Sequence, residues 1–259
     1  MDLGLSGKAA LVTGSYRGTG AGIAGILAGE GAHVVVHGFA EGQPDDVVAQ
    51  IVADGGSASG LVADVSTDEG AAELGDLARP VDIVVNNYGT PVGSTWTKMD
   101  DWEEEWNRNV LVGVRVAQAF LPGMRERGWG RIVFVGTLGA RKPGTHNPGY
   151  YAAKAGLRTL VRTLAMETRG TGVTANLVSP GMIATAEVRE MLTRSAAKRD
   201  IGPEWVDIER WGLERVMPNL TERLPDPTDI GRIVAFLASE AAWHINGADI
   251  AADGGAIDA

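Results

Sequence analysis

A tyrosine and a lysine, Tyr150 and Lys154, stand four positions apart in a stretch with a helical pattern. Residues at this spacing share one face of a helix, so the two side chains can act together. A free phenol has a pKa of about 10, and a neighbouring ammonium group favours the phenolate and lowers that pKa. Such a pair could transfer a proton at neutral pH. The same spacing also occurs on helices without a catalytic role, and Tyr151 is a rival tyrosine.

A glycine-rich segment near the N-terminus is the second candidate for chemistry. It spans residues 13–20, reads TGSYRGTG, and lies between an apolar β-rich run and a helical run. Gly14, Gly18 and Gly20 allow a sharp turn and the close approach of a pyrophosphate, whose charge a helix N-terminus favours. The position between strand and helix therefore favours cofactor binding over a purely structural turn.

The composition excludes several classes of protein. The 259 residues suit one large domain or two small ones, and 44% of them are hydrophobic, which is enough for a large core. The formal net charge of −10, without a basic block, argues against binding to nucleic acid or to an anionic membrane. The absence of cysteine excludes disulfides, thiolate zinc sites and thiol catalysis, and four scattered histidines argue against a metal site. No secretory signal and no apolar run of ~18 residues is present, so we expect a cytoplasmic protein.

Short apolar runs alternate with helical stretches along the chain. Strands are predicted over residues 9–14, 32–38, 59–65, 81–87, 130–137, 173–181 and 247–255. Helices are predicted over residues 18–30, 45–53, 68–78, 101–127, 150–169 and 228–239, and Pro122 is the predicted point of a split. This alternation predicts a doubly wound α/β fold with a parallel sheet, which binds ligands at the carboxyl ends of its strands. Residues 186–222 carry many charges and no strand pattern, which predicts a lid insertion in a single domain.

The spacing of the glycine segment, T-G-x-x-x-G-x-G, resembles that of the short-chain dehydrogenase/reductase family. Further motifs match in the family's order, and these are Asn86-Asn87-Tyr88-Gly89, Tyr150-x-x-x-Lys154, Pro180-Gly181 and Asp253-Gly254-Gly255. The matches extend from residue 13 to residue 255, and they are specific together although each alone is not. Tyr88 departs from the family's alanine. The resemblance implies a Rossmann-like fold and hydride transfer between a nicotinamide cofactor and a carbonyl compound or secondary alcohol.

The resemblance also implies four catalytic residues. They are Asn109, Thr137, Tyr150 and Lys154. Tyr150 would exchange the proton, and Lys154 would lower its pKa and bind the cofactor ribose. Thr137 replaces the family's serine and would orient the substrate oxygen, unless it merely ends a strand. Asn109 would hold a helix kink and relay protons to the lysine, unless it is an exposed helix residue.

The expected cofactor-binding residues lie at five of the predicted strand ends and on the helix predicted over residues 150–169, and the resemblance implies all of them except Ser15 and His37. They are Gly14, Ser15, Arg17, Gly18, Gly20, His37, Asp64, Val65, Asn86, Gly89, Tyr150, Lys154, Pro180, Gly181, Ile183 and Thr185. Asp64 is expected near the adenine ring, or else as a helix N-cap, for which Ser66 is better suited. Asn86 and Gly89 are expected to bracket a ribose, although Asn86 could instead join neighbouring strands.

The choice between NADP(H) and NAD(H) depends on the residues around the adenosine ribose. No carboxylate follows the second predicted strand, where an NAD site places one. Arg17 offers a guanidinium that matches a 2′-phosphate, and we expect the Ser15 hydroxyl and His37, as a partial cation, to assist it. These residues favour NADP(H) over NAD(H), whereas Phe39 stands near a point where many NADP-dependent members have arginine.

The substrate is expected to be a small ketone or alcohol. Candidate pocket residues are Leu138, Gly139, Pro143, His146, Met191, Trp205, Trp211 and the loop 90–93. The two lid tryptophans either contact an apolar substrate or pack the lid onto the body. By resemblance we also expect a homotetramer and no metal. The alternatives are an NAD-dependent alcohol dehydrogenase, a non-redox epimerase or lyase, and a cofactor-binding regulatory protein without turnover.

Overall fold

A parallel β-sheet forms the centre of the computed structural model, which describes residues 2–76 and 80–256. Its seven strands follow the order β3-β2-β1-β4-β5-β6-β7. The strands are β1 (Ala9–Val12), β2 (His33–Gly38), β3 (Ser57–Val62), β4 (Ile83–Asn86), β5 (Gly130–Val135), β6 (Val173–Pro180) and β7 (Asp249–Ala252). Every neighbouring pair is parallel, so all carboxyl ends meet at one edge of the sheet.

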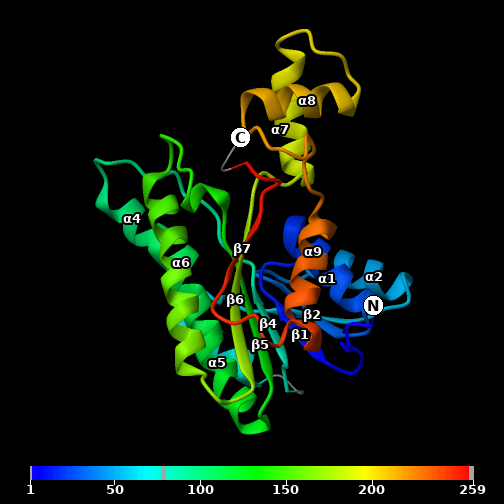
Figure 1. Ribbon diagram of the computed structural model, residues 1–259, viewed down its shortest axis with the longest axis vertical. Helices are drawn as coiled ribbons and strands as arrows, with labels where there is room; N and C mark the ends of the chain where they lie inside the picture. Colours follow the sequence, from blue (N-terminus) through cyan, green and yellow to red (C-terminus); the bar gives the residue numbers. More distant parts are fainter. Residues whose placement is uncertain (1, 77–79, 257–259) are drawn as a thin grey trace.

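Helices cover both faces of this sheet (Figure 1). One face is covered by α1 (Gly18–Gly29), α2 (Asp45–Ala53) and α9 (Pro227–Leu237). The other is covered by α5 (Val112–Arg127) and α6 (Pro148–Glu167). Helix α4 (Met99–Trp106) packs on α6, and the short α3 (Asp68–Glu73) packs on α5. The predicted doubly wound, Rossmann-like fold is thus confirmed, because near-continuous apolar strands need a helical layer on each face.

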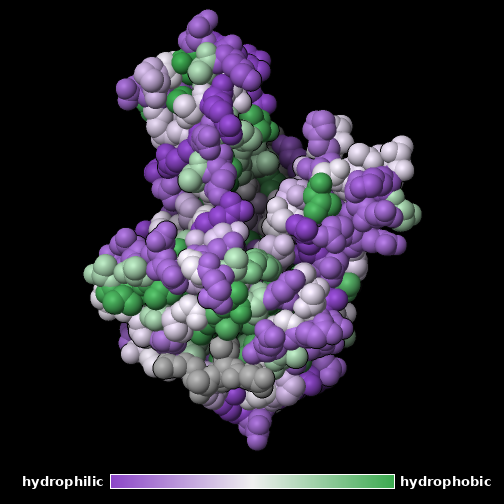
Figure 2. Space-filling view, turned by 180° about the vertical axis from the view of Figure 1, so that it is seen from behind, coloured by the Kyte–Doolittle hydropathy of each residue, from purple (hydrophilic) through white to green (hydrophobic). Residues whose placement is uncertain are grey.

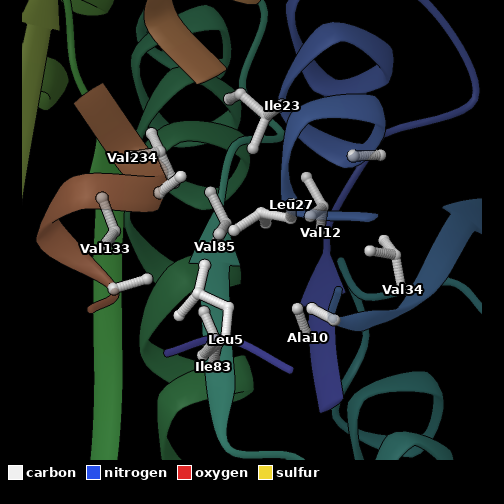
Figure 3. Close-up of a cluster of buried hydrophobic side chains, with 14 of the residues drawn as sticks. Leu5, Ala10, Val12, Ile23, Leu27, Val34, Ile83, Val85, Val133 and Val234 are labelled. Carbon is white, nitrogen blue, oxygen red and sulfur yellow. The ribbon is translucent and has the colours of Figure 1, made fainter. Parts of the chain in front are cut away.

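Two apolar cores hold these layers together. In the first, Ile23 and Leu27 of α1 and Val234 of α9 meet Val12 and Val85 of the sheet (Figure 3). The second core lies on the opposite face, between the sheet and helices α5 and α6. Each fully buried valine or leucine contributes about 1.5–3 kcal/mol. The cores therefore make the sheet a rigid base for the loops at its carboxyl edge.

Two predicted elements differ from the structure in ways that affect the site. Strand β3 ends at Val62, so residues 63–65 belong to the following loop. The long helix predicted over residues 101–127 does not split at Pro122, which lies inside α5. It is interrupted instead by a π-helical turn, η2 (Asn107–Leu111). The end of the helix predicted over 68–78 falls on residues 77 and 78, outside the described residues.

The π-helical turn has a local cause. The side-chain Nδ2 of Asn109 donates a hydrogen bond of 3.0 Å to the carbonyl oxygen of Glu105. In a regular α-helix this oxygen accepts from the backbone N–H four residues later, which is that of Asn109 itself. The side chain therefore competes with the backbone, and the turn widens.

Beyond the carboxyl edge, the segment predicted as a lid forms two helices, α7 (Ala186–Ala197) and α8 (Trp205–Arg215) (Figure 1). They share a small apolar cluster of their own, which includes Leu192, Ile208 and Leu213. Much of the lid surface seen from behind is hydrophilic (Figure 2). In the part of the chain that the structure describes, no helix is long and apolar enough to cross a membrane.

Candidate active site

A cleft of about 620 Å³ lies at the carboxyl edge of the sheet, at the base of the lid. The glycine segment, the ends of β4, β5 and β6, and the first turns of α6 and α7 form its walls. Its lining residues are Gly14, Tyr16, Arg17, Gly18, Thr19, Gly20, Asn87, Tyr88, Gly89, Thr90, Pro91, Val135, Gly136, Thr137, Tyr150, Lys154, Pro180, Gly181, Met182, Ile183, Thr185, Glu187 and Val188. The space-filling surface is hollowed beside the base of the lid (Figure 2).

The glycine segment leaves the N-terminus of α1 available to an anion. Arg17 is the N-cap, yet its side chain makes no capping hydrogen bond, and the first turn holds no acidic residue. A Cβ at Gly20 would lie 2.7 Å from the carbonyl oxygen of Gly14 and 2.6 Å from Nδ2 of Asn87. The loop can therefore close this tightly only around glycine. Free N–H groups at a helix start, facing a cleft, fit the pyrophosphate of a dinucleotide.

The expected phosphate-binding roles of Ser15 and His37 are wrong. Both side chains are fully buried. The Ser15 hydroxyl donates to the Val12 carbonyl at 2.7 Å and accepts the His37 backbone N–H at 2.9 Å. Nδ1 of His37 accepts the Gly14 N–H at 3.0 Å, and Nε2 donates to the Ala63 carbonyl at 2.9 Å. These partners require the neutral imidazole, and burial lowers the pKa of His37, so this ring shapes the loop and carries no charge.

Arg17 extends from the glycine segment toward the lid. Its Nη1 pairs with Oε1 of Glu187 at 2.8 Å, and both side chains are more than half exposed, at 62% and 53%. The guanidinium also lies near the ring of Tyr16. A pair this exposed holds the two elements weakly, so Arg17 can exchange Glu187 for another anion in the cleft. Glu187 is a cleft residue that the sequence analysis missed.

The hydroxyl of Thr137 lies beside that of Tyr150, and their interaction favours a lower pKa of the phenol. Thr137 follows β5, and its Oγ1 also accepts the N–H of Gly139 at 3.2 Å, so the hydroxyl proton points away from the backbone. Both residues line the cleft, whereas Tyr151 packs beside Gly139 outside the lining. A carbonyl oxygen in the cleft could thus meet two hydroxyl donors that the fold has already placed.

The expected lowering of the Tyr150 pKa is not what the structure gives. Burial raises the pKa of Tyr150 to about 12, against the smaller effect of the Thr137 hydrogen bond. Burial likewise lowers the pKa of Lys154 to about 8. Both charged forms lose solvation inside the protein, and this loss exceeds their mutual attraction. At neutral pH Tyr150 is therefore a phenol, which is the form that donates a proton.

Lys154 and Asn109 converge on Gly89. The Lys154 side chain is buried, and Nζ donates to the Val135 carbonyl at 3.0 Å. A Cβ at Gly89 would lie 2.6 Å from Nζ of Lys154 and 2.7 Å from Oδ1 of Asn109. Asn109 is buried in the π-helical turn behind the cleft, and its Oδ1 has no hydrogen-bond partner. Gly89 therefore provides the space in which these two polar groups approach each other.

Three of the predicted cofactor contacts lie outside the cleft lining. Asp64 is exposed, and its carboxylate accepts the N–H and hydroxyl of Ser66. The N-cap of α3 is Thr67, so both proposed caps, Asp64 and Ser66, are wrong. Val65 is buried in the core. Asn86 is buried with both amide atoms unpartnered, so it makes no bond between strands.

Asn87, the residue after Asn86, makes the bonds between neighbouring strand ends that were expected of Asn86. Nδ2 of Asn87 donates to the Thr13 carbonyl at 2.9 Å, and its backbone N–H donates to the Thr13 hydroxyl at 3.1 Å. These bonds hold the β4 exit against the glycine segment. Asn87 could have been found from the sequence, since it shares the Asn-Asn motif with the predicted Asn86.

At the β6 exit, Pro180, Gly181, Ile183 and Thr185 line the cleft. Oγ1 of Thr185 accepts the Val188 N–H and so also begins α7. The path from the cleft floor to the lid is therefore only a few residues long, and a ligand at this exit would touch the lid helix directly.

Several expected pocket residues lie elsewhere. Trp205 and Trp211 pack against the apolar cluster of the lid, beside the guanidinium groups of Arg189 and Arg199. Neither tryptophan lines the cleft, and the same holds for Met191, Leu138, Gly139, Pro143 and His146. Of the loop 90–93, Thr90 and Pro91 line it. Two apolar residues that were not expected from the sequence also line the cleft, Met182 before the lid and Val188 in its first helix.

Comparisons with known proteins agree with this geometry. A family model described as short chain dehydrogenase matches residues 8–196. The D-beta-hydroxybutyrate dehydrogenase of Cupriavidus necator is 35% identical, over 97% of this chain and 98% of that protein. The 3-oxoacyl-[acyl-carrier-protein] reductase of Pseudomonas aeruginosa is 34% identical, over 98% of each chain.

The fold comparison gives the same family. The L-sorbose reductase of Gluconobacter frateurii, solved with NADPH and L-sorbose, has a TM-score of 0.90 and 30% identity, and the match covers 100% of both chains. The fold and these comparisons define an oxidoreductase of the doubly wound class. The chain belongs to the short chain dehydrogenase family.

Lys154 should cost the protein stability at neutral pH. Replacing it with methionine removes a buried ammonium whose pKa is lowered to about 8. After the lost hydrogen bond to Val135 is deducted, we expect the free energy of unfolding at about pH 7 to rise by about 2 kcal/mol.

The pH dependence checks the cause of this gain. The folded state loses the lysine proton at lower pH than the unfolded state, so wild-type stability rises between about pH 8 and the ordinary lysine value of 10.5. The advantage of Lys154→Met should therefore shrink at about pH 10 in urea titrations. The exposed Lys198→Met is the matched control, and an equal gain there would contradict the explanation.

Proposed function

We propose that this protein is an NADP(H)-dependent ketoreductase or alcohol dehydrogenase with Tyr150 as its acid and base. The proposal rests mainly on one observation. The Tyr150–Thr137 hydroxyl pair and the buried Lys154 line the same cleft as an uncapped, glycine-rich helix start. The family relationship supports the reaction class, and the named relatives above act on different alcohols and ketones.

The residues of the cleft suit reduction of a carbonyl group. When bound, the nicotinamide supplies the hydride. Thr137 holds the substrate oxygen in line, and the Tyr150 phenol gives that oxygen its proton. Lys154 then stands behind the tyrosine as the cation that offsets the transient phenolate, and Asn109 supports the return of a proton from the interior. The glycine segment, Gly89 and the β6 exit would hold the dinucleotide.

A panel of ketones and alcohols, assayed with NADPH and with NADH by nicotinamide absorbance, tests the proposal. Turnover of any ketone or alcohol supports an oxidoreductase. Nicotinamide binding without turnover across the panel would favour a regulatory protein, or an epimerase or lyase. Better kcat/KM with NADH would favour an NAD-dependent alcohol dehydrogenase instead.

The cofactor preference depends on Arg17, because Ser15 and His37 are unavailable. A charge-assisted bond to the 2′-phosphate contributes about 1.5–3 kcal/mol, so Arg17→Ala should weaken NADPH binding by about 10- to 100-fold and leave NADH binding unchanged. Glu187→Gln is the matched variant, since it releases Arg17 from its pair and should strengthen NADPH binding. Dissociation constants from fluorescence titration measure both effects. An unchanged NADPH-to-NADH ratio in Arg17→Ala would remove the case for NADP(H).

We also propose that the chain assembles as a homotetramer. Large exposed side chains on α4 and α6, Trp106 and Met166, and near β7, Trp243, support an assembly through the long helices and the C-terminal region. Light scattering of the purified protein gives the mass that tests it.

A further inference from the structure

Glu105 is a glutamate without exposed surface in the last turn of α4. Each oxygen of its carboxyl group has a partner. Oε1 accepts the backbone N–H of Val92 at 2.8 Å, and Oε2 accepts Nδ2 of Asn109 at 3.0 Å. Both donors are neutral amides. Burying a carboxyl group is costly unless it is well bonded, so its presence at this position calls for a function.

The carboxyl group and two backbone carbonyls together set which way the Asn109 amide faces. Nδ2 of Asn109 donates to Oε2 of Glu105, to the Glu105 carbonyl at 3.0 Å and to the Thr90 carbonyl at 3.3 Å. A flipped amide would set its oxygen against three acceptors. The unpartnered Oδ1 must therefore face the other way, toward Gly89 and the ammonium of Lys154.

The same carboxyl group holds the edge of the cleft. Its bond to Val92 anchors the loop whose preceding residues, Thr90 and Pro91, line the cleft. Glu105 thus joins two parts of the site, the loop 90–93 and Asn109 beside Lys154. Its own side chain does not line the cleft.

We propose that Glu105 is a positioning residue: it orients the Asn109 amide so that an acceptor faces Lys154, and it fixes the loop 90–93. The consequence for catalysis rests on the proposed function, in which Lys154 and Asn109 return protons to Tyr150. The orientation of the amide does not rest on it.

Glu105→Gln replaces a carboxyl oxygen, which accepts hydrogen bonds, with an NH₂ group, which donates them, and almost no change in shape accompanies it. The glutamine oxygen must stay with the Val92 N–H, so its NH₂ group faces Asn109. Two NH₂ groups then face each other, and Asn109 has to shift from its bonds to the carbonyls of Glu105 and Thr90, which moves its oxygen away from Lys154. We expect kcat to fall about tenfold with an altered pH profile, while KM and the NADPH dissociation constant stay within about twofold. The exposed Glu103→Gln, on the same helix, is the matched control.

Asn109→Asp is the complementary change. It loses the donor to Glu105 and places a second carboxyl group beside the first. In the double variant Glu105→Gln/Asn109→Asp, the new NH₂ group donates to one aspartate oxygen, and the other oxygen faces Lys154. The bond between side chains 105 and 109 and the acceptor that faces Lys154 are restored, although the two bonds to the backbone carbonyls are lost, so kcat should exceed that of each single variant.

Unfolding of the cofactor-free protein gives a second readout. Two carboxyl groups in contact raise their folded-state pKa, so the stability of Asn109→Asp should be greatest in acid and fall, relative to wild type, between about pH 5 and about pH 8. Around Glu105, the other charged or titratable groups are Arg108 of η2, Tyr150 of α6 and, beyond Asn109, Lys154. All are kept in every variant, and the double variant should lack the slope.

The two readouts separate the possible failures. If the wild-type protein shows no turnover but the effects of the changes at positions 105 and 109 on the free energy of unfolding are coupled, the positioning of Asn109 is supported and the proposed function is refuted. Glu105→Gln with unchanged kcat and pH profile, or a double variant whose losses are simply additive in both readouts, would overturn the role of Glu105.

Discussion

Tyr150→Phe should reduce turnover of any ketone substrate by about 10³-fold while NADPH still binds with wild-type affinity. The variant keeps the ring and removes only the hydroxyl that lies beside Thr137. Proton donation by a placed side chain contributes about 10²–10⁴-fold, and solvent reaches this partly buried position poorly. Single-turnover kinetics with preformed enzyme–NADPH complex measures the loss directly.

Tyr151→Phe is the control for this change. Tyr151 is the adjacent residue and its ring lies 5.6 Å from that of Tyr150, but it lies outside the cleft lining. Its hydroxyl should be dispensable, with kcat within about threefold of wild type. Equal losses in the two variants, or a Tyr150→Phe enzyme with nearly normal kcat, would exclude Tyr150 as the proton donor.

Gly89→Ala should lower kcat about 10²-fold in a protein that still folds. The added methyl group would lie 2.6 Å from Nζ of Lys154 and 2.7 Å from Oδ1 of Asn109, so the two groups have to separate. Lysine is flexible and can withdraw, and the free energy of unfolding should change by about 1 kcal/mol or less. Steady-state kinetics and urea unfolding of the same preparation check both parts.

A second glycine-to-alanine substitution, away from the cleft, is the control that distinguishes crowding of Lys154 from a general effect of adding a methyl group. Gly25 lies in α1, and a Cβ there would meet no atom within 4 Å. Gly25→Ala should keep full activity and gain slightly in stability, because alanine is the better helix former. If Gly89→Ala lost NADPH affinity in proportion to kcat, the loss would come from the cofactor contact of Gly89 and not from the displacement of Lys154.

Local patterns identified most of the fold. Short apolar runs between helical stretches predicted all seven strands, and a strand followed by Gly18 and Gly20 marked the helix start that faces the cleft. The boundaries failed where a side chain competed with the backbone. Pro122 was the obvious helix breaker, yet the turn opens at Asn109, whose amide takes the carbonyl that its own N–H would use.

The site was predictable where a motif is short and contiguous. Tyr150 and Lys154 are one helical turn apart, so any helix brings them to one face. Glu105 gave a usable signal as well, because it stands one turn before Asn109 on the same face. It was missed because a glutamate among several acids in α4 reads as a solvated residue.

The sequence by itself determined the alternation of strands and helices, the glycine segment and the tyrosine–lysine turn, because these depend on neighbours within a few residues. Only the tertiary structure decided that His37 is neutral, that Arg17 meets the lid, and that burial moves the pKa values of Tyr150 and Lys154 away from each other. Such properties arise from solvent exclusion and from contacts between distant segments. Neither is encoded in local spacing, since both depend on which faces the folded chain brings together.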